Sequence, residues 1–377
     1  MQKIECDVAV IGGGCAGLSL GYEYAQIQGK KLSVCILEKR EDYHNDRTWS
    51  FWLPRQHDFS HQDLILHSWK AWRFSSRNRN YIHRSKELIY SHISALSFYQ
   101  KTTQAIEQDS WQTLVMHQDV TTLEKHKGAF KIEGPNLSLT AKHVIDTRPY
   151  EAAELIDRTR IFQIFAGVEI EVEVDIFDPE IVGLMDDLKS DHDSCHFRYF
   201  LPFTKRRALI EMTSFSTAYF SPTDLDQALF RYIDGLGVPY KILREERGVL
   251  PMGIDHSADL GNGIILGGMK NNNLKPSSGY GFLRTQIWAK QMAQKIFDDT
   301  LDIPLNKQSH RVGDFFDDTF LRVLQRDMRL AENIFLSIGE NMRPDSFAKF
   351  MRDDAGFFDF IGLIAAVPKK PFIKAVF

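Results

Sequence analysis

The chain has 377 residues, of which 43% are hydrophobic and 25% are charged, and its formal net charge is −4. These values are typical of a folded protein large enough for two joined domains, and they exclude a disordered chain. The basic residues are scattered, which excludes DNA and RNA as expected partners, and no run of about 18 uncharged apolar residues is present to span a membrane.

Residues 6–17, CDVAVIGGGCAG, predict a strand, a tight turn and the start of a helix that extends to Ala25. Gly12, Gly14 and Gly17 match the pattern G-x-G-x-x-G. The first glycine permits the turn, the second lets the backbone approach a pyrophosphate, and the third lets the helix pack on the strand. Because a helix N-terminus also attracts phosphate, we expect a dinucleotide here.

The next expected strand, Leu32–Leu37, leads to Glu38, 21 residues after Gly17. A carboxylate at about this distance binds the ribose 2′-hydroxyl, and its charge disfavours the 2′-phosphate of NADP. The motif therefore predicts NAD or FAD at this site and leaves the choice between them open.

The chain then leaves the nucleotide-binding pattern. Residues 53–93 are rich in Trp, His and Arg, with a strand-like piece at Trp69–Phe74, and a helix is expected at Ser94–Ala105. Residues Trp111–Ile145 alternate apolar and polar positions, which predicts an antiparallel meander that ends in the buried strand His143–Asp146. The following sequence, IDTRP, is interpreted as a turn.

From Glu151 to about Arg247 the pattern changes to longer alternating strands, notably Phe162–Val174 and Phe197–Glu211, which predicts a second, mostly antiparallel domain. A strand is expected at Gly263–Leu266 and a helix at residues 283–296, where apolar residues recur at near-helical spacing. We expect both to belong to the nucleotide-binding domain. Beyond Pro304 only helices are expected, with one apolar face that runs from Leu321 to Phe335.

These patterns divide the chain into four parts. We expect residues 1–150 and 248–300 to form the nucleotide-binding domain, 151–247 the antiparallel domain and 301–377 a helical C-terminal region. Residues 53–93 could instead join the antiparallel domain.

The C-terminal segment, residues 356–377, concentrates phenylalanine and isoleucine beside Lys369, Lys370 and Lys374. A basic, strongly apolar segment of this kind can lie in the surface of a bilayer. A terminal helix packed on the core is the alternative, and the pattern does not decide between the two.

A second glycine motif precedes the helix at 283–296, where Pro276, Gly279 and Gly281 form the pattern P-x-x-G-x-G. Two such motifs about 260 residues apart resemble the FAD-binding fold of the hydroxybenzoate-hydroxylase type. The resemblance implies that the first motif holds the ADP half of FAD and the second meets the flavin. Gly268 belongs to the same predicted site, although this chain has Gly-Gly-Met where that family has Gly-Asp. The expected fold class is therefore mixed α/β, with a Rossmann-like FAD-binding domain, an antiparallel-sheet substrate domain and a helical C-terminal region.

Four segments narrow the resemblance: HNDRTWSFW, VGLMDDL, FRYFLPFTKRRALIEMTSFS and KPSSGYGF. In this order and spacing they resemble those of bacterial lycopene cyclases, and the correspondence extends from Asp7 to beyond Arg322. The resemblance implies an isomerase that closes the acyclic ends of lycopene to β-rings without net redox change. It also implies a hydrophobic carotenoid substrate and noncovalent FAD that must be reduced, commonly by NADPH.

Such chemistry needs an acid that protonates an alkene, and a carboxyl group shielded from water can keep its proton near neutral pH. Glu211 ends the apolar run RALIE and is our candidate for general acid and, after the transfer, general base. The alternative is a strand-end glutamate paired with Arg206, Arg207 or solvent. Relatives often carry a second acidic residue directly after this glutamate, where this chain has Met212. Asp186, in GLMDDL, is the second candidate acid, with a surface turn as its alternative.

A carbocation is stabilised by the electron-rich faces of aromatic rings. The candidate substrate-lining residues are Trp49, Phe51, Trp52, Tyr199, Phe203 and Tyr280. Ordinary packing in the core is the alternative for each of them.

Two other functions fit the same sequence. A flavin-dependent monooxygenase or isoprenoid reductase of this fold would consume NAD(P)H in proportion to product, and a noncatalytic flavoprotein would only bind an isoprenoid. The four cysteines lack C-x-x-C spacing, which predicts neither disulfides nor zinc, and no signal peptide is expected before the first strand. We therefore expect a cytoplasmic protein, peripheral to the inner face of the membrane. The ring type, the exact carotenoid, the electron donor and the oligomeric state stay open.

Overall fold

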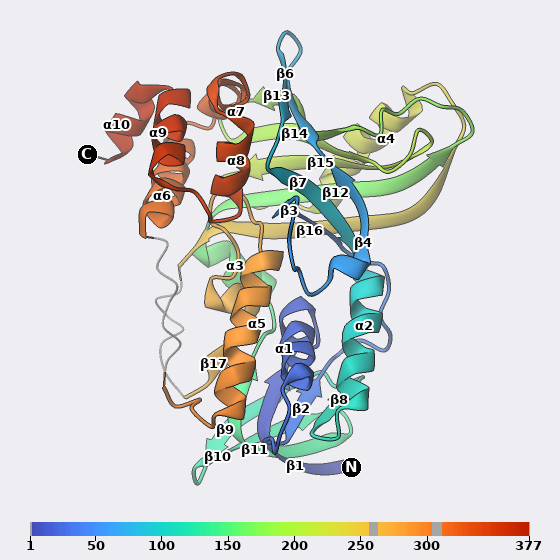
Figure 1. Ribbon diagram of the computed structural model, residues 1–377, viewed down its shortest axis with the longest axis vertical. Coiled ribbons are helices and arrows are strands. Elements are labelled where there is room, and N and C mark those ends of the chain that lie inside the picture. The colour runs from blue at the N-terminus through green and yellow to red at the C-terminus, as the bar shows by residue number, and fades with distance from the viewer. Residues whose placement is uncertain (1, 256–262, 304–310, 377) are drawn as a thin grey trace.

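The computed structural model describes residues 2–255, 263–303 and 311–376. Figure 1 shows a nucleotide-binding sheet with its helices at the end of the molecule that holds the N-terminus, and a large antiparallel sheet with the C-terminal helices at the other. The structure also has a third sheet, of three strands. It consists of β3 (Thr48–Pro54), β4 (Ile65–Trp69) and β7 (Leu88–Ser94).

The nucleotide-binding sheet has the strand order β8-β2-β1-β11-β10-β9, with β17 beside β11. Its strands are β1 (Gln2–Ile11), β2 (Val34–Leu37), β8 (Gln112–Val115), β9 (Thr122–His126), β10 (Ala129–Gly134), β11 (Leu137–Asp146) and β17 (Ile265–Leu266). Alternation along β1 fills both faces: Val8 and Val10 pack with the helices, whereas Ala9 and Ile11 pack with the meander β9-β10-β11. The observed meander contains β9, β10 and β11 and is shorter than the predicted one. β8, which the prediction included, pairs in parallel with β2 after the chain has crossed over through a helix.

Three helices cover this sheet, namely α1 (Cys15–Gln26), α2 (Ala95–Gln108) and α5 (Phe282–Phe297). The helix expected at 94–105 is confirmed as α2, and it begins there because the Ser94 side chain caps it by accepting the Ser97 N–H. In Figure 1, α5 lies beside α1, so the chain returns late to the element with which it began.

The large sheet has the order β16-β12-β15-β14-β13-β5-β6, and its pairs are antiparallel except β13 with β5. Its strands are β5 (Ala71–Ser75), β6 (Asn80–Arg84), β12 (Thr159–Val172), β13 (Ile181–Ser190), β14 (Ser194–Pro202), β15 (Arg207–Ser216) and β16 (Tyr240–Ile254). The strand expected at Phe197–Glu211 is a hairpin instead, because the polar residues Thr204, Lys205 and Arg206 turn the chain between β14 and β15.

Strand positions also bear on the expected domain limits. β5 and β6, from within residues 53–93, pair in the large sheet, while β3, β4 and β7 form their own sheet. The limit expected after Arg247 falls inside β16, whose pairing with β12 extends to Ile254. The other domain limits stay predictions.

The remaining helices flank the large sheet. They are α3 (Ala152–Arg158), α4 (Asp226–Asp234), α6 (Arg311–Arg326), α7 (Leu330–Asn341), α8 (Pro344–Met351), α9 (Phe357–Ala366) and α10 (Lys369–Val376), with short 3-10 turns at Gln62–Leu64, Pro222–Leu225 and Gly268–Asn271. The predicted apolar face from Leu321 to Phe335 is buried, but it is divided between α6 and α7 and packs on the sheet beside Leu184 and Phe215. Among the described residues, no helix has both the length and the apolar character needed to cross a bilayer.

Candidate active site

The first glycine motif wraps the N-terminus of α1. Gly12 has a φ of +104°, and a Cβ on Gly17 would lie 2.0 Å from the carbonyl oxygen of Gly12. Gly14 is the N-cap of α1 and has no side chain to cap the helix, and a Cβ there would meet nothing within 4 Å. Gly14, Cys15 and Ala16 at this helix end line the cavity, and a helix N-terminus at a cavity wall can bind phosphate.

Glu38 follows β2 and holds the glycine loop directly. One carboxylate oxygen accepts the Gly13 N–H at 2.7 Å and the other accepts the Arg40 N–H at 2.9 Å. The side chain is buried against the loop, at the place where the sequence predicts a ribose.

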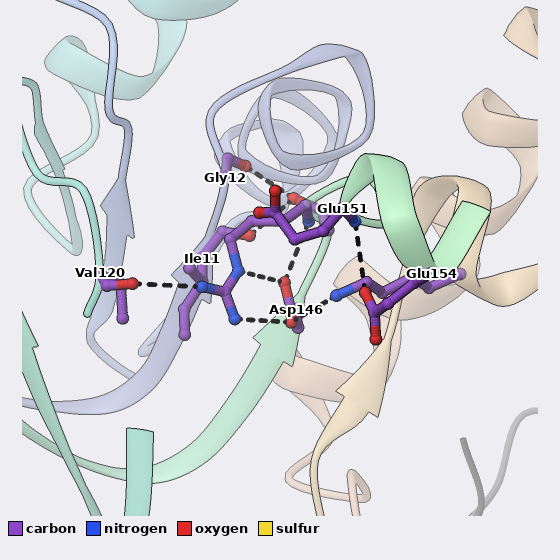
Figure 2. Close-up of polar contacts among 9 residues, drawn as sticks. Ile11, Gly12, Val120, Asp146, Glu151 and Glu154 are labelled. Carbon is purple, nitrogen blue, oxygen red and sulfur yellow. Dashed lines mark hydrogen bonds and ion pairs between the residues drawn. The ribbon is translucent and has the colours of Figure 1, made fainter. Parts of the chain in front are cut away.

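Asp146, at the end of β11, braces the first glycine motif against the segment that carries Gly268 (Figure 2). Its carboxylate accepts hydrogen bonds from Nε and Nη2 of Arg148 at 3.0 and 2.9 Å, and from Nζ of Lys270 at 3.1 Å. The neighbouring Thr147 hydroxyl donates to the Gly12 carbonyl at 2.7 Å. Sequence analysis interpreted IDTRP only as a turn and missed this brace, because Lys270 lies 124 residues away from Asp146.

The second glycine motif forms the other half of the cradle. Gly279 has a φ of +70° and Gly268 one of +59°, and Gly281 is the N-cap of α5 without a capping side chain. Gly268, Gly279 and Gly281 line the same cavity as Gly14, whereas Pro276 does not. Two open helix ends on one cavity fit an elongated dinucleotide such as FAD.

A buried ion network holds this loop against the C-terminal helices. Lys275 is 1% exposed and donates to Asp317 on α6 at 3.1 Å and to Asp353, just after α8, at 2.9 Å. Arg284 on α5 also binds Asp353, and Ser277 donates to Asp317 at 2.6 Å. The loop conformation therefore depends on residues about 40 to 80 positions further along the chain, and no local signal predicted them.

Four residues of the large sheet form one row across neighbouring strands. Tyr199 on β14 pairs with Glu211 on β15, Glu211 pairs with Gly167 on β12, and Gly167 pairs with Glu246 on β16. Directly paired residues point to the same face of a sheet. A Cβ on Gly167 would lie 2.4 Å from Cγ of Glu211, so the glycine provides the space in which the two carboxyl groups approach each other.

Glu246 is a member of the site that sequence analysis missed. Its Oε2 accepts the Thr48 hydroxyl at 2.8 Å and Nη1 of Arg244 at 2.7 Å, and Nε of Arg244 binds Glu169 at 2.6 Å. The acidic run EER gave no sign of this role, because Glu245 and Glu246 occupy opposite faces of β16 and the pattern does not say which face is covered.

The two carboxyl groups of the row titrate in opposite directions. Burial raises the pKa of Glu211 well above its usual range, and the negative charge of the neighbouring Glu246 raises it further. Burial also disfavours the charged form of Glu246, but its interactions with Glu211 and Arg244 lower its pKa overall. These directions favour the protonated form of Glu211 and the ionised form of Glu246.

The alternative partners considered for Glu211 are engaged elsewhere. Arg206 binds Asp175 at 2.6 Å, and Arg207 binds Glu169. Glu211 is thus not a strand-end residue paired with the turn arginines.

Three tyrosines, the buried Tyr90 and the partly buried Tyr199 and Tyr280, connect the second glycine motif to this row. The Tyr90 hydroxyl lies 2.7 Å from that of Tyr199 and 2.6 Å from that of Tyr280. Burial raises the pKa of all three, so they are neutral hydroxyls that can donate and accept hydrogen bonds beside Glu211.

Asp186 does not lie in the cavity. Its carboxylate accepts hydrogen bonds from Nε and Nη2 of Arg73 on the neighbouring β5 at 2.8 and 2.5 Å, and from the Ser75 hydroxyl at 3.0 Å. Leu184 and Met185, which precede it on β13, line the cavity instead. Asp186 is therefore an ion-paired residue of the sheet outside the cavity, and its role as a second acid stays a prediction.

The predicted aromatic lining is divided by the structure. Trp49, Tyr199 and Tyr280 line the cavity, whereas Phe51 and Trp52 are buried in the core and Phe203 is partly buried at its edge. Phe51 stacks on Phe282 with ring centroids 5.0 Å apart, Trp52 packs on Tyr90, and Phe203 packs on Trp69. The structure therefore places Phe51 and Trp52 in the core, and Phe203 packs against it outside the cavity.

A single cavity of about 770 Å³ joins these parts. It extends from Gly14 and the second glycine motif past Glu211 and Glu246 to the helices α6, α9 and α10. At that end Phe315, Ile364 and Ile373 both line the cavity and are exposed on the surface. The cavity thus opens through an apolar helical surface.

A parallel sheet with two glycine cradles, joined to a large antiparallel sheet, defines the fold of FAD-dependent oxidoreductases. Among solved structures, a geranylgeranyl bacteriochlorophyll reductase-like protein from Thermoplasma acidophilum matches with a TM-score of 0.65 and 15% identity over 99% of both chains. The halogenase PltM, solved in complex with phloroglucinol and FAD, matches with a TM-score of 0.55 and 11% identity over 89% of this chain and 79% of that chain.

Residues 7–362 match the family described as Lycopene cyclase protein, and the chain belongs to this family. A lycopene beta-cyclase from Paracoccus sp. strain N81106 is 34% identical over 125 residues, which is 32% of each chain. A chloroplastic lycopene beta cyclase from Solanum lycopersicum is 23% identical over 78% of this chain and 61% of that protein. The matched segments cover less than two thirds of either relative.

Proposed function

We propose that this protein cyclises the acyclic ends of lycopene to β-rings in carotenoid biosynthesis, with bound FAD and without net redox change. The observation that carries the proposal is the buried carboxyl group of Glu211 in the wall of a mostly apolar cavity, where burial raises its pKa and favours the protonated acid. An acid of this kind can protonate an alkene, and the apolar walls exclude the water that would otherwise trap a carbocation. Membership of the lycopene cyclase family supports the choice of substrate.

The residues that would hold FAD are those of the two cradles. We assign the ADP half to Gly12, Gly14, Gly17 and Glu38, and the flavin half to Gly268, Gly279 and Gly281, with Pro276 in the same loop but outside the cavity lining. When bound and reduced, with NAD(P)H as the proposed electron donor, FAD supplies negative charge near a cation without electron transfer to the substrate. The network of Lys275 keeps the second cradle in the conformation that this requires.

In the proposed reaction, Glu211 acts first, as the general acid. Its carboxyl group donates a proton to the terminal alkene, the neighbouring alkene attacks the resulting cation to close the ring, and loss of a proton leaves the ring double bond. The ring faces of Trp49, Tyr199 and Tyr280 line the cavity and stabilise the positive charge by cation–π interaction, which contributes about 0.5–2 kcal/mol for each ring in contact.

We further propose that the substrate reaches the cavity from a membrane, with the protein cytoplasmic and peripheral to the inner face. Phe357 and Phe358 on α9 are 74% and 82% exposed, and Ile364 of the same helix is exposed and lines the cavity. Lys370 and Lys374 flank this surface and suit anionic headgroups.

The test is pigment analysis in a host that accumulates lycopene. The intact chain should convert lycopene to a product of identical mass with β-ring absorbance, and Glu211→Gln should abolish the conversion, while Glu245→Gln on the opposite face of β16 should preserve it. A product whose mass differs by hydrogen or oxygen would instead identify a reductase or monooxygenase. Unchanged pigment with Glu211→Gln would reject acid catalysis by this residue.

A further inference from the structure

The charges around the row do not balance unless one carboxyl group is protonated. Three carboxyl groups, those of Glu169, Glu211 and Glu246, face two guanidinium groups, those of Arg207 and Arg244. Glu169 binds both arginines and Glu246 binds Arg244, whereas no ion pair to Glu211 occurs among the described residues. A third buried negative charge would lack a partner, so the surplus proton is part of the folded structure.

Glu246 has the position and the free lone pairs of a base. It is 4% exposed and lines the same cavity as Glu211. Thr48 and Arg244 both bind its Oε2, which fixes the carboxylate, while Oε1 is buried and accepts no hydrogen bond in the described part of the chain. An ionised carboxylate with one anchored and one free oxygen is prepared to accept a proton.

We propose that Glu246 is a second catalytic carboxylate, which takes up the proton that the cyclised cation loses while Glu211 supplies the proton that starts the reaction. The assignment rests on the proposed function. The O–H bond of Glu211 breaks as a C–H bond forms at the terminal alkene, and the electron pair of the next alkene forms the ring bond. A ring C–H bond then breaks, its electrons form the ring double bond, and its proton bonds to Oε1 of Glu246. Transfer of that proton to Glu211 restores the pair, and the substrate neither gains nor loses electrons.

This division of labour explains the glycine between the two strands. With Gly167 in the row, the carboxyl groups approach each other across β12, so one proton can pass between them. A larger residue would separate them and leave each with its own titration.

Glu246 also controls the pH range in which Glu211 is an acid. The titratable and charged groups that face the pair are Tyr199 on β14, Arg244 on β16, Glu169 on β12, His92 on β7 and Tyr280 in the loop before α5. Burial lowers the pKa of His92 to about 3, and both tyrosines are neutral, so Glu246 is the negative charge that acts on Glu211. Loss of this charge allows Glu211 to ionise at a lower pH.

The test compares the FAD-loaded full chain with its Glu246→Gln and Glu246→Asp variants on lycopene in phosphatidylcholine vesicles, under reducing conditions and across a range of pH. Glu246→Gln should lower kcat about 100-fold or more with little change in KM, and the fall of activity at alkaline pH should begin at a lower pH than in the wild type. Glu246→Asp keeps the charge, so it should retain the wild-type pH profile and recover part of kcat. Glu245→Gln is the matched control on the opposite face of β16.

The outcomes separate the assignment from the function on which it rests. Absence of ring products from the wild type would overturn both, whereas ring products together with a Glu246→Gln variant that keeps wild-type kcat and pH profile would overturn the role of Glu246 alone. Equal losses in Glu246→Gln and Glu246→Asp, with an unchanged pH profile, would also overturn it, since they indicate a structural ion pair. If Glu246→Gln does not fold, Gly167→Ala is tested instead, because it retains both carboxyl groups. The proposal then requires that the activity of Gly167→Ala begin to fall at a lower pH than that of the wild type.

Discussion

Replacement of Glu211 by glutamine should stabilise the protein, and the gain should grow with pH. In the native state, burial and Glu246 hold the pKa of Glu211 well above its usual value of 4.5, so the carboxyl group keeps a proton that the unfolded chain has lost. The free energy of unfolding of the wild type therefore falls by about 1.4 kcal/mol per pH unit above the unfolded-state pKa, until the native pKa is reached. Glutamine has nearly the same shape and cannot ionise, so it removes this penalty.

Urea unfolding of the two proteins, followed by tryptophan fluorescence at several values between about pH 5 and 8, measures the difference directly. The difference in the free energy of unfolding should be small at the acid end and increase by about 3 kcal/mol over two pH units. The control Glu245→Gln lies at the surface in an ion pair with Arg247 and should change stability by less than about 0.5 kcal/mol at each pH. A difference that is constant with pH, or that decreases as pH rises, would refute the assignment of the proton to Glu211.

Two further predictions concern the C-terminal helices. Lys275→Met should destabilise the protein by about 3–5 kcal/mol in urea unfolding, because it leaves Asp317 as a buried charge without its cation; a loss below about 1 kcal/mol would show that the network does not hold the loop. The double replacement of Phe357 and Phe358 by serine should leave stability within about 0.5 kcal/mol, since both side chains are exposed, but weaken sedimentation with anionic phospholipid vesicles at least tenfold. Unchanged sedimentation would place the membrane contact elsewhere.

Local sequence signals predicted the nucleotide-binding half of the fold well, because its motif is contiguous. Strand, turn, helix and acidic residue follow one another between Cys6 and Glu38, and each is required by close contact with its neighbours along the chain. The same reasoning interpreted residues 197–211 as one strand, although a polar turn divides them, since alternation continues on both sides of a tight hairpin.

Tertiary partners decided the remaining assignments, and no local pattern encodes them. Asp186 has the residue type and the apolar surroundings of a candidate acid, yet Arg73, from a strand more than a hundred residues earlier, neutralises it. Lys275 lies beside the second glycine motif and shows no local sign of its role. The two carboxylates that it binds, those of Asp317 and Asp353, lie in the C-terminal region. In both cases the sequence shows one member of an ion pair and the fold selects the other.

The residue after Glu211 does not face the cavity, whatever its type. Successive residues of a strand point to opposite faces, so residue 212 cannot face the cavity that Glu211 faces. Met212 packs into the separate cluster of Phe162 and Ile210, whereas Thr213, two residues after Glu211, lines the cavity. A partner for Glu211 must therefore come from a neighbouring strand, and with glycine in the intervening row the next side chain on that face is Glu246. The methionine thus removes no carboxylate from the cavity face, and the pairing of Glu211 with Glu246 is set by the register of β15, β12 and β16.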